Sequence, residues 1–250
     1  MISKAKIKLI QSLKSKKYRE KHRFFVVEGE KSVNDLLQAG MKAVQLYIVP
    51  EFAENRFVSD IELNPVTESE MKKISFLSTP GNILALFEIP QYSIQQSFEQ
   101  NFILALDNVQ DPGNLGTIIR LADWFGIKDI VCSKNTADVF NPKVVQATMG
   151  SIARVRVHYV DLAGYLKKAT DKYTVYGSFM RGKSMYETDF SEKKILIMGN
   201  EGKGISSEIE QLVSKKVSIP RFTQEDSVPE SLNVAMATGI ILSEMMRPRN

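Results

Sequence analysis

The second half of the sequence alternates short apolar runs with helix-like segments, and this alternation constrains the fold more than any other feature. Apolar runs of strand length occur at 102–107, 129–132, 154–160, 173–178, 194–199 and 216–220. Helical patterns follow near 114–125, 141–149, 161–170, 206–213 and 232–246. Nearly continuous apolar strands joined by helices are typical of a parallel sheet covered on both faces. The pattern therefore predicts an α/β fold with a parallel sheet, whose ligands bind beyond the carboxyl ends of the strands.

The N-terminal part of the chain shows a smaller pattern of the same kind. Strands are expected at 24–29, 44–49 and 83–89, and helices at 1–21, 30–38 and 69–74. The segment 90–101 is rich in Gln and Ser and is predicted to be a linker. We therefore expect two domains, a small α/β domain at residues 1–95 and a larger one at residues 101–250.

Positive charge is concentrated at the N-terminus. Residues 1–23 contain nine Lys or Arg and one Glu, so they carry +8, while the chain of 250 residues carries +4 and the remainder therefore −4. A basic arm on a mildly acidic body favours contact with a polyanion such as RNA, although a solvated, frayed terminus would look similar. The candidate RNA-binding residues are Lys14, Lys16, Lys17, Arg19, Lys21 and Arg23.

Cysteine and histidine are scarce, which excludes several classes of site. Cys132 is the single cysteine, so no intramolecular disulfide can form, and its apolar surroundings favour a buried, inert thiol. The two histidines, His22 and His158, lie in different contexts, and we expect no metal site. The N-terminus lacks an apolar signal core and no apolar run reaches membrane-spanning length, so we expect a cytoplasmic protein without a membrane contact.

The stretch NVQDPGNLGTIIR (108–120) follows the first strand of the larger domain. It matches neither a phosphate loop nor a dinucleotide fingerprint, because the required glycine and lysine spacings are absent. Asn114 is predicted to cap the following helix, and Arg120 falls on its polar face, where it contacts either a phosphate or hydroxyl group or merely solvent. The residues expected to face the core are Leu115, Ile118, Ile119 and Ala122.

Two later loops also follow predicted strands. ILIMGNEGKGIS (195–206) has three glycines within six residues, more than a plain strand–helix turn needs, and its Glu201 favours a neutral or cationic ligand over a polyphosphate. Ser207 and Glu210 fit a capping box for the next helix. The third loop lies in the stretch VSIPRFTQEDSVPESLNVAMATGIIL (217–242), between the last predicted strand and the last helix. Ser231 is predicted to be the N-cap of that helix. Asn233 is expected to bond a loop or ligand, because the helix is otherwise almost wholly apolar.

Together these stretches resemble a known family. The ordered set NVQDPGNLGTIIRLADWFG, IMGNEGKGIS and SIPRFTQEDSVPESLNVAMATGIIL, with NPKVVQATMGS between the first two, is similar to the motifs of the SpoU (TrmH-type) RNA ribose 2′-O-methyltransferases of the SPOUT superfamily. The N-terminal part resembles the small substrate-binding domain, similar to an RNA-binding ribosomal protein, that many members carry. The resemblance spans nearly the whole chain.

The resemblance implies a deep trefoil knot at the C-terminal end, S-adenosylmethionine bent within the knot, and a homodimer whose active sites take residues from both subunits. The implied cofactor-binding residues are Ser178, Met198, Gly199, Gly204, Ile219 and Leu232. The implied catalytic residues are Asn114, Arg120, Glu201, Ser231 and Asn233. The family's arginine at Arg120 is often named as the base, but a guanidinium stays protonated at ordinary pH. We therefore expect Arg120 to clamp a phosphate and orient the ribose hydroxyl.

Two features depart from the family pattern: the loop RFTQEDSVPE (221–230) is long and charged, and Trp124 stands where small or polar residues are frequent. The N-terminal domain favours 23S rRNA as the substrate. The alternatives are a tRNA 2′-O-methyltransferase, a non-catalytic knotted RNA-binding assembly factor and, from a third class, a Rossmann nucleotide enzyme, against which the failed fingerprints argue.

Overall fold

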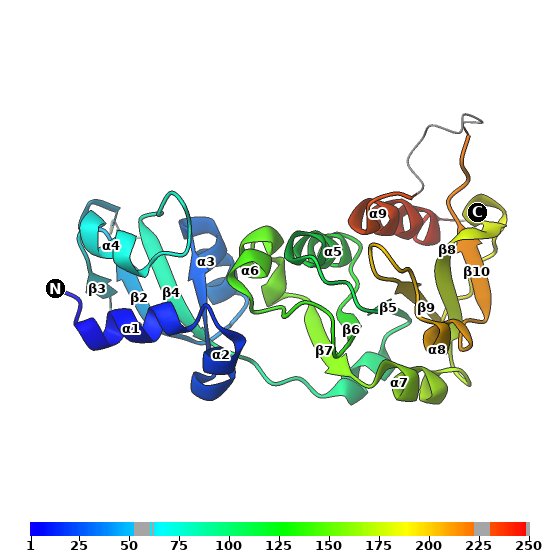
Figure 1. The fold of residues 1–250 in the computed structure, drawn as a ribbon, viewed down its shortest axis with the longest axis horizontal. Helices are drawn as coiled ribbons and strands as arrows, with labels where there is room; N and C mark the ends of the chain where they lie inside the picture. Colours follow the sequence, from blue (N-terminus) through cyan, green and yellow to red (C-terminus); the bar gives the residue numbers. More distant parts are fainter. Residues whose placement is uncertain (53–60, 62, 223–230, 249–250) are drawn as a thin grey trace. The chain divides into compact units, whose positions relative to one another are not determined.

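The chain divides into two compact units, shown in Figure 1. The computed structural model describes residues 1–52, 61, 63–222 and 231–248. The first unit comprises residues 1–91 together with residues 138–154, and the second comprises residues 92–137 and 155–250. The segment 138–154 therefore packs with the N-terminal unit, although the chain on both sides of it belongs to the second unit.

The first unit is built on a mixed four-stranded sheet in the order β1-β4-β2-β3, in which the β1–β4 and β4–β2 pairs are antiparallel and the β2–β3 pair is parallel. Its strands are β1 (Phe24–Glu28), β2 (Ala43–Ile48), β3 (Leu63–Pro65) and β4 (Ile83–Glu88). Its helices are α1 (Lys4–Ser12), α2 (Lys16–His22), α3 (Glu30–Gln38), η1 (Pro50–Phe52), α4 (Glu68–Ile74), α6 (Pro142–Thr148) and η3 (Ser151–Ala153). The strand β3 was not anticipated from the sequence.

The basic N-terminal segment forms two helices, so the prediction of a single helix over residues 1–21 is wrong. The chain leaves helical geometry at Ser15, which is extended. The buried guanidinium of Arg19 donates to the carbonyl oxygens of Leu13 and Lys14 at 2.7 and 2.8 Å. These carbonyls are left without helical partners where α1 ends, so the Arg19 side chain stabilises the break.

The second unit contains a six-stranded sheet in the order β10-β8-β9-β5-β6-β7, and every pair in it is parallel. Its strands are β5 (Phe102–Leu106), β6 (Asp129–Ser133), β7 (Arg156–Val160), β8 (Thr174–Ser184), β9 (Lys194–Met198) and β10 (Lys215–Ser218). Its helices are η2 (Ile94–Glu99), α5 (Pro112–Trp124), α7 (Leu162–Ala169), η4 (Met185–Glu187), α8 (Ser207–Glu210) and α9 (Val234–Met245). The predicted parallel α/β sheet is confirmed.

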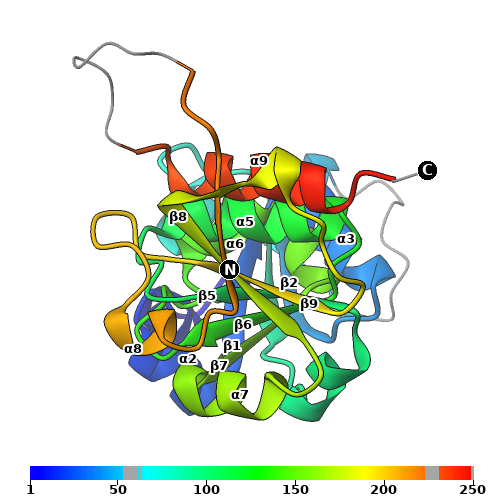
Figure 2. The same ribbon diagram turned by 90° about the vertical axis from the view of Figure 1, so that its right-hand side faces the viewer.

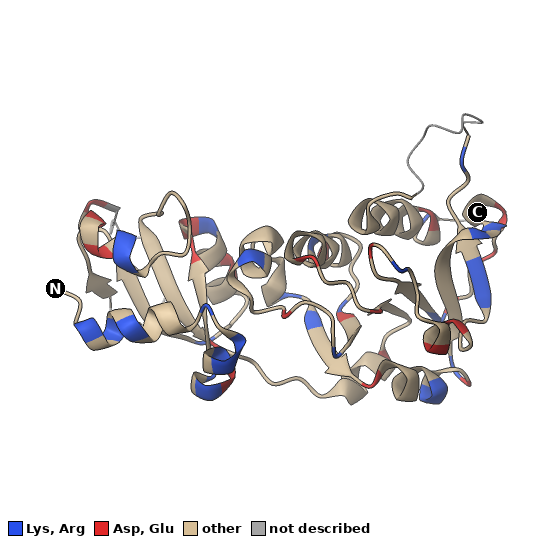
Figure 3. Ribbon diagram, in the orientation of Figure 1, with Lys and Arg blue, Asp and Glu red and all other residues tan. Residues whose placement is uncertain are grey.

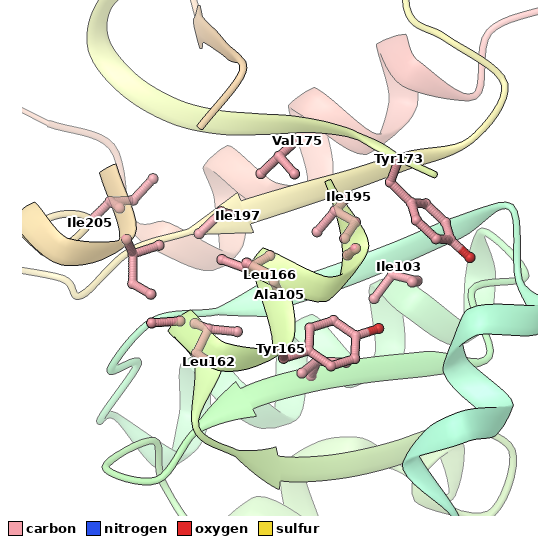
Figure 4. Packing of buried hydrophobic residues seen from close by; sticks show 14 residues of the cluster. Ile103, Ala105, Leu162, Tyr165, Leu166, Tyr173, Val175, Ile195, Ile197 and Ile205 are labelled. Carbon is pink, nitrogen blue, oxygen red and sulfur yellow. The ribbon is translucent and has the colours of Figure 1, made fainter. Parts of the chain in front are cut away.

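Helices cover both faces of this sheet: α5 and α9 lie on one face, and α7 and α8 lie on the other (Figure 2). The core beneath α7 shows the period of two expected of strands. Ile103 and Ala105 of β5, with Ile195 and Ile197 of β9, pack against the helix residue Leu166, and all five are fully buried (Figure 4). Burial on both faces explains why these strands are nearly continuous apolar runs.

The strand β8 is longer than the run predicted at 173–178 and carries a large irregularity. Lys216 of β10 pairs with Gly177, and the next residue, Val217, pairs with Lys183, so residues 178–182 have no partner in β10. A Cβ atom on Gly182 would lie 2.9 Å from the carbonyl oxygen of Lys216, which explains a glycine at this close approach.

The trefoil knot stays a prediction, because residues 223–230, in the segment between β10 and α9, lie outside the described residues. Most of the charged loop noted in the sequence falls there too. Cys132 is fully buried, as expected, and burial raises the pKa of its thiol. No helix among the described residues is long and apolar enough to cross a membrane.

Candidate active site

The N-terminus of α5 differs from its sequence prediction. Asp111, not Asn114, is the N-cap, and its carboxylate accepts from the backbone N–H of Asn114 at 2.8 Å. Pro112 occupies the first helical turn, where its missing N–H costs nothing. Asn114 therefore lies inside the helix with its side chain free for another partner. The predicted core face is confirmed, since all four of its residues are fully buried, namely Leu115, Ile118, Ile119 and Ala122.

Arg120 lies on the exposed side of the same helix. No hydrogen bond or ion pair joins its guanidinium to another residue in the described part of the chain. An arginine held on a helix but left without a protein partner retains its full capacity for bidentate contact with a phosphate.

Glu201, in the glycine-rich loop after β9, binds the loop that precedes α5. Its Oε1 accepts from the backbone N–H of Asp111 at 3.1 Å and from Asn114 Nδ2 at 3.1 Å. Its Oε2 accepts from the backbone N–H of Gln110 at 3.3 Å and from Asn200 Nδ2 at 3.3 Å. The carboxylate is therefore engaged by protein donors, and it fixes the first loop against the second.

Asn233 extends this network to the third loop. Its Nδ2 donates to Asn114 Oδ1 at 2.9 Å, while its Oδ1 accepts from the backbone N–H groups of Ala235 and Met236. Asn233 is thus the N-cap of α9, and the prediction of that role for Ser231 is wrong; Ser231 is exposed two residues before it. The side chain of Asn233 is therefore paired, but with a residue in the first turn of α5 and not with a loop. A bond from Asn233 to a ligand stays a prediction. We call the hydrogen-bonded chain Asn233–Asn114–Glu201 the relay.

Burial and hydrogen bonds to its carboxylate act in opposite directions on the pKa of Glu201. Burial opposes a lower pKa, but hydrogen bonds from Asn114 and the backbone N–H groups of Asp111 and Gln110 outweigh it and bring the pKa below its ordinary value of 4.5. Because the folded pKa is depressed, ionised Glu201 stabilises the fold above pH 4.5, and this contribution is lost as the pH falls through the folded pKa.

We therefore expect the stability difference between the unsubstituted chain and Glu201→Gln to shrink as the pH falls from about 6 to about 3. Urea unfolding at each pH measures it. Glu208→Gln, at an exposed position nearby on α8, is the charge-matched control and should show no such trend. A stability difference for Glu201→Gln that stays constant over the range would contradict the hydrogen-bonded, ionised state.

The backbone is tightly closed in the loop after β9. Asn200 and Gly204 exchange backbone hydrogen bonds, each of 2.9 Å. A Cβ atom on Gly199 would lie 2.3 Å from both the carbonyl carbon of Gly204 and the nitrogen of Ile205, so only glycine fits. Gly204 has φ of +70°. The predicted capping box is wrong, since Ser206, not Ser207, is the N-cap of α8 and its side chain makes no capping hydrogen bond.

The sequence analysis missed the residues that hold these loops at the sheet. Asn200 Nδ2 donates to the carbonyl oxygen of Asn108 at 2.7 Å, and its Oδ1 accepts from the backbone N–H groups of Gly202 and Lys203. Asp107, 2% exposed, accepts from the backbone N–H of Ser206 at 2.7 Å. Asp107 follows β5 directly and Asn200 is the second residue after β9, and these positions at strand ends were the available signal.

The remaining cofactor candidates come from three further places. Ser178 follows Gly177, which is the last β8 residue that pairs with β9 and pairs there with Ile197. Ile219 follows β10 directly and is half-buried, and Leu232, which is 50% exposed, precedes the N-cap of α9. Ser178 therefore lies just beyond the paired part of β8, while Ile219 and Leu232 lie near the two ends of the third loop.

The basic N-terminal helices carry most of the RNA-binding candidates, and Figure 3 shows lysines and arginines along both. Lys14, Lys16, Lys17, Lys21 and Arg23 are exposed. Arg19 differs, because it is 2% exposed and its Nη2 lies 2.6 Å from Asp138 Oδ2. The expectation that Arg19 contacts RNA is therefore corrected: its side chain holds the first unit together.

His158 is buried and bonded to another side chain of the same sheet. Its Nε2 lies 2.8 Å from Oδ1 of the fully buried Asp129, whose carboxylate also accepts two hydrogen bonds from Arg156. Among the described residues, no group of three or more His, Cys, Asp and Glu side chains is arranged to hold a metal ion.

Two family models match most of the chain. Residues 101–243 match the SpoU rRNA Methylase family, and residues 4–85 match the MRM3-like substrate binding domain. The chain is 31% identical over 243 residues to the 23S rRNA (guanosine(2553)-2′-O)-methyltransferase RlmP of Bacillus subtilis (strain 168), covering 95% of this chain and 94% of that one.

Solved structures are similar over the whole chain. A TrmH-family protein from Porphyromonas gingivalis is 38% identical with a TM-score of 0.87, covering 98% of each chain. The AdoMet-bound rRNA methyltransferase from Sinorhizobium meliloti is 30% identical with a TM-score of 0.85, covering 98% of this chain and 95% of that one.

The chain belongs to the SpoU rRNA methylase family and carries an MRM3-like substrate binding domain at its N-terminus. The family predicted from the sequence motifs is confirmed, and with it the RNA 2′-O-ribose methyltransferase class of enzyme. S-Adenosylmethionine as the cofactor is confirmed for the group, because it is bound in the structure from Sinorhizobium meliloti.

Proposed function

We propose that this chain transfers the methyl group of S-adenosylmethionine to the 2′-hydroxyl group of a guanosine in 23S rRNA, and that it acts in the cytoplasm. Two relatives that match it over most of their length, RlmP of Bacillus subtilis and RlmB of Neisseria meningitidis, are 23S rRNA guanosine 2′-O-methyltransferases by name. The substrate-binding domain accompanies the methylase region here, which supports a large rRNA over a tRNA.

The observation that carries the proposal is the relay beside a free arginine. Asn233 and Glu201 both bond the side chain of Asn114, one through its oxygen and the other through its nitrogen. The first turn of α5 is thereby fixed from two loops that come from different strands. Arg120 lies about two turns further along the same helix, so the relay determines where its guanidinium is presented.

The chemistry needs positioning more than proton transfer. S-Adenosylmethionine supplies a methyl group on a positively charged sulfur, and the bond from carbon to sulfur breaks as the bond to the ribose oxygen forms. The hydroxyl proton is released to water. Arg120 holds the adjoining phosphate and aligns the hydroxyl group with the methyl group. In model reactions such alignment lowers the activation barrier by about 7–11 kcal/mol. Ser231 is close to Asn233 in the chain and completes the set of polar groups we assign to the ribose side.

The backbone of the second loop supplies the cofactor cradle. Gly199 admits no side chain, because the main chain of Gly204 and Ile205 already fills that space. The loop is therefore a closed turn, and we assign the cofactor contacts to the main chain of Met198, Gly199 and Gly204. We add Ser178, which follows the last β8 residue paired with β9, to this surface. Ile219 and Leu232 supply apolar contacts from the third loop. A neutral or cationic ligand fits this loop, because the Glu201 charge beside it would repel a polyphosphate.

We assign RNA binding to the domain at residues 1–95 and methyl transfer to the domain at residues 101–250. The exposed cations Lys14, Lys16, Lys17, Lys21 and Arg23 provide the electrostatic contact with the RNA backbone. Since phosphate contacts carry little sequence information, this arm contributes affinity and orientation, and the choice of nucleotide falls to other contacts.

We further infer a homodimer formed through α9. This helix packs against α5, and Gly239 lies close enough to Leu121 that a Cβ atom would be 3.4 Å from its methyl groups. Large apolar side chains remain exposed here: Met236 is 62% exposed and Trp124, on α5, is 85% exposed. Apolar side chains gathered on one helix pair are typical of a subunit interface.

Met236→Glu should weaken the dimer at least about 100-fold, because two-fold symmetry places the new charge in the interface twice. Sedimentation over a range of protein concentrations measures the effect. Gln211→Glu, at the exposed C-cap of α8, adds the same charge away from α9 and should leave the dimer unchanged. Equal sedimentation of the two variants as dimers would exclude α9 as the interface.

A transfer assay tests the proposed function. The purified chain is incubated with methyl-labelled S-adenosylmethionine and total RNA from cells that lack the gene, and the RNA is then fractionated. Label in 23S rRNA is the expected result. Label in tRNA would support the tRNA enzyme, and RNA binding without label or cofactor binding would support a non-catalytic assembly factor.

A further inference from the structure

A pocket of about 290 Å³ lies within the first unit, where α6 packs against β1. Its walls are mostly apolar and include Val26, Leu77, Val145 and the ring of Phe76. A volume near the lower end of the range for small-ligand sites, about 300–1,000 Å³, suits a planar group such as one nucleobase. Since α6 belongs to the region matched by the SpoU methylase family, both matched regions of the chain build this pocket.

One buried charged residue, Glu28, is among those that line this pocket. Glu28 is 6% exposed, its Oε2 accepts from Ser75 Oγ at 2.5 Å, and its Oε1 accepts from the backbone N–H of Phe76 at 2.8 Å. A carboxylate has about four acceptor positions, so both oxygens keep capacity for another donor. Burial raises the pKa of Glu28 against these hydrogen bonds, as expected of a carboxylate that is short of donors.

Positive charge borders the pocket. Lys143 and Gln146, both exposed, line it from α6. Lys14 Nζ lies 5.0 Å from the centre of the Phe76 ring and belongs to the basic arm assigned above to the RNA backbone. An aromatic wall, a fixed acceptor and neighbouring cations match the way in which proteins bind single-stranded RNA bases, by stacking, edge hydrogen bonds and phosphate contacts.

We propose that this pocket binds one unpaired guanine of the RNA substrate, with the base against Phe76 and its N1–H and N2–H groups donating to the Glu28 carboxylate. Guanine presents two adjacent donors on this edge, whereas adenine presents an acceptor beside its single amino group and uracil a donor between two carbonyl groups. Lys14 then contacts a phosphate that flanks the base. The inference rests on the proposed RNA substrate and adds a site of base selection distant in sequence from Arg120.

Binding of short RNAs to the full chain tests this site. Fluorescence anisotropy compares the labelled hexamers UUGUUU, UUIUUU and UUAUUU, where inosine lacks the N2 amino group of guanine. The guanine hexamer should bind about tenfold more tightly than the adenine hexamer, with inosine between them. Glu28→Gln should abolish this preference, whereas Glu68→Gln, an exposed charge-matched control in the same domain, should retain it.

Leu77→Trp, which fills the pocket from its partly exposed wall, is a second variant in case Glu28→Gln disturbs the fold, and thermal unfolding checks both. The inference is overturned if the guanine hexamer binds no more tightly than the other two, or if both variants keep a guanine preference. Methyl transfer to 23S rRNA is measured separately with the unsubstituted chain. If the chain transfers methyl groups but shows no guanine preference, only the pocket proposal is rejected. If the chain transfers no methyl groups, the proposed function is rejected.

Discussion

Arg120→Ala should lower the rate of methyl transfer to RNA by about 10²–10³-fold while leaving cofactor binding and thermal unfolding nearly unchanged. The expected loss corresponds to removing one preorganised donor from a site where charge and alignment determine the rate. Stability should hold, because the side chain is exposed and is bonded to no other residue that the structure describes. Single-turnover methyl transfer with saturating cofactor measures the change.

Two further variants separate orientation from simple charge. Arg120→Lys keeps the charge but loses the planar fork of donors, so its rate should fall between those of alanine and arginine. Lys128→Ala removes an exposed cation just beyond α5 and should transfer methyl groups at the normal rate. If Arg120→Ala folds normally and transfers methyl groups at the normal rate, Arg120 does not position the RNA for the reaction.

Gly199→Ala should weaken S-adenosylmethionine binding at least about 100-fold. The added Cβ atom would lie 2.3 Å from the backbone of Gly204 and Ile205, a distance that real Cβ atoms do not adopt, so the loop must open. A loop that holds a ligand through its main chain cannot be displaced without loss of those contacts. Titration calorimetry with the cofactor measures the effect.

The same loop offers a matched control. A Cβ atom on Gly202 would meet nothing closer than Asn200 Oδ1 at 3.8 Å, which is ordinary contact. Gly202→Ala should therefore bind the cofactor with unchanged affinity. Equal affinities for Gly199→Ala and Gly202→Ala would show that the closed turn after β9 is not the cofactor cradle.

Periodicity and strand-end position predicted much of the second unit. The parallel sheet followed from apolar runs joined by helices, and the core face of α5 followed from the spacing of Leu115, Ile118 and Ile119. The three loops that we assign to the site could be proposed from the sequence, because ligand-binding residues in such sheets follow the strands. The knot could be expected only from the resemblance to the family, because the passage of a chain through a loop does not change the spacing of apolar residues in the sequence.

Capping was predicted less well, for an identifiable reason. Asn114 and Ser231 are good capping residues by type, but Asp111 and Asn233 take those positions in the structure. Several polar residues stand in a row before each helix, and tertiary hydrogen bonds decide which of them caps it. Asn114 is bonded by Glu201 and Asn233, two partners that are 87 and 119 residues away in the sequence.

The charge of Glu201 was predicted to favour a neutral or cationic ligand over a polyphosphate, and the structure shows a structural role for it. Its oxygens accept from side chains and backbone of the first loop, so the carboxylate organises the protein as well as the electrostatics of the loop. The basic arm shows a similar distinction. From the sequence, Arg19 was expected to be one more RNA contact. In the structure its side chain is buried and forms an ion pair with Asp138, so it stabilises the fold.

The central claim, that this chain methylates a guanosine of 23S rRNA at its ribose, is tested most directly by mapping 2′-O-methyl groups in 23S rRNA from wild-type cells and from cells that lack the gene. The account predicts that one guanosine loses its methyl group in the mutant cells and regains it when their RNA is treated with the purified chain and S-adenosylmethionine. Identical 23S rRNA maps from the two strains would contradict it.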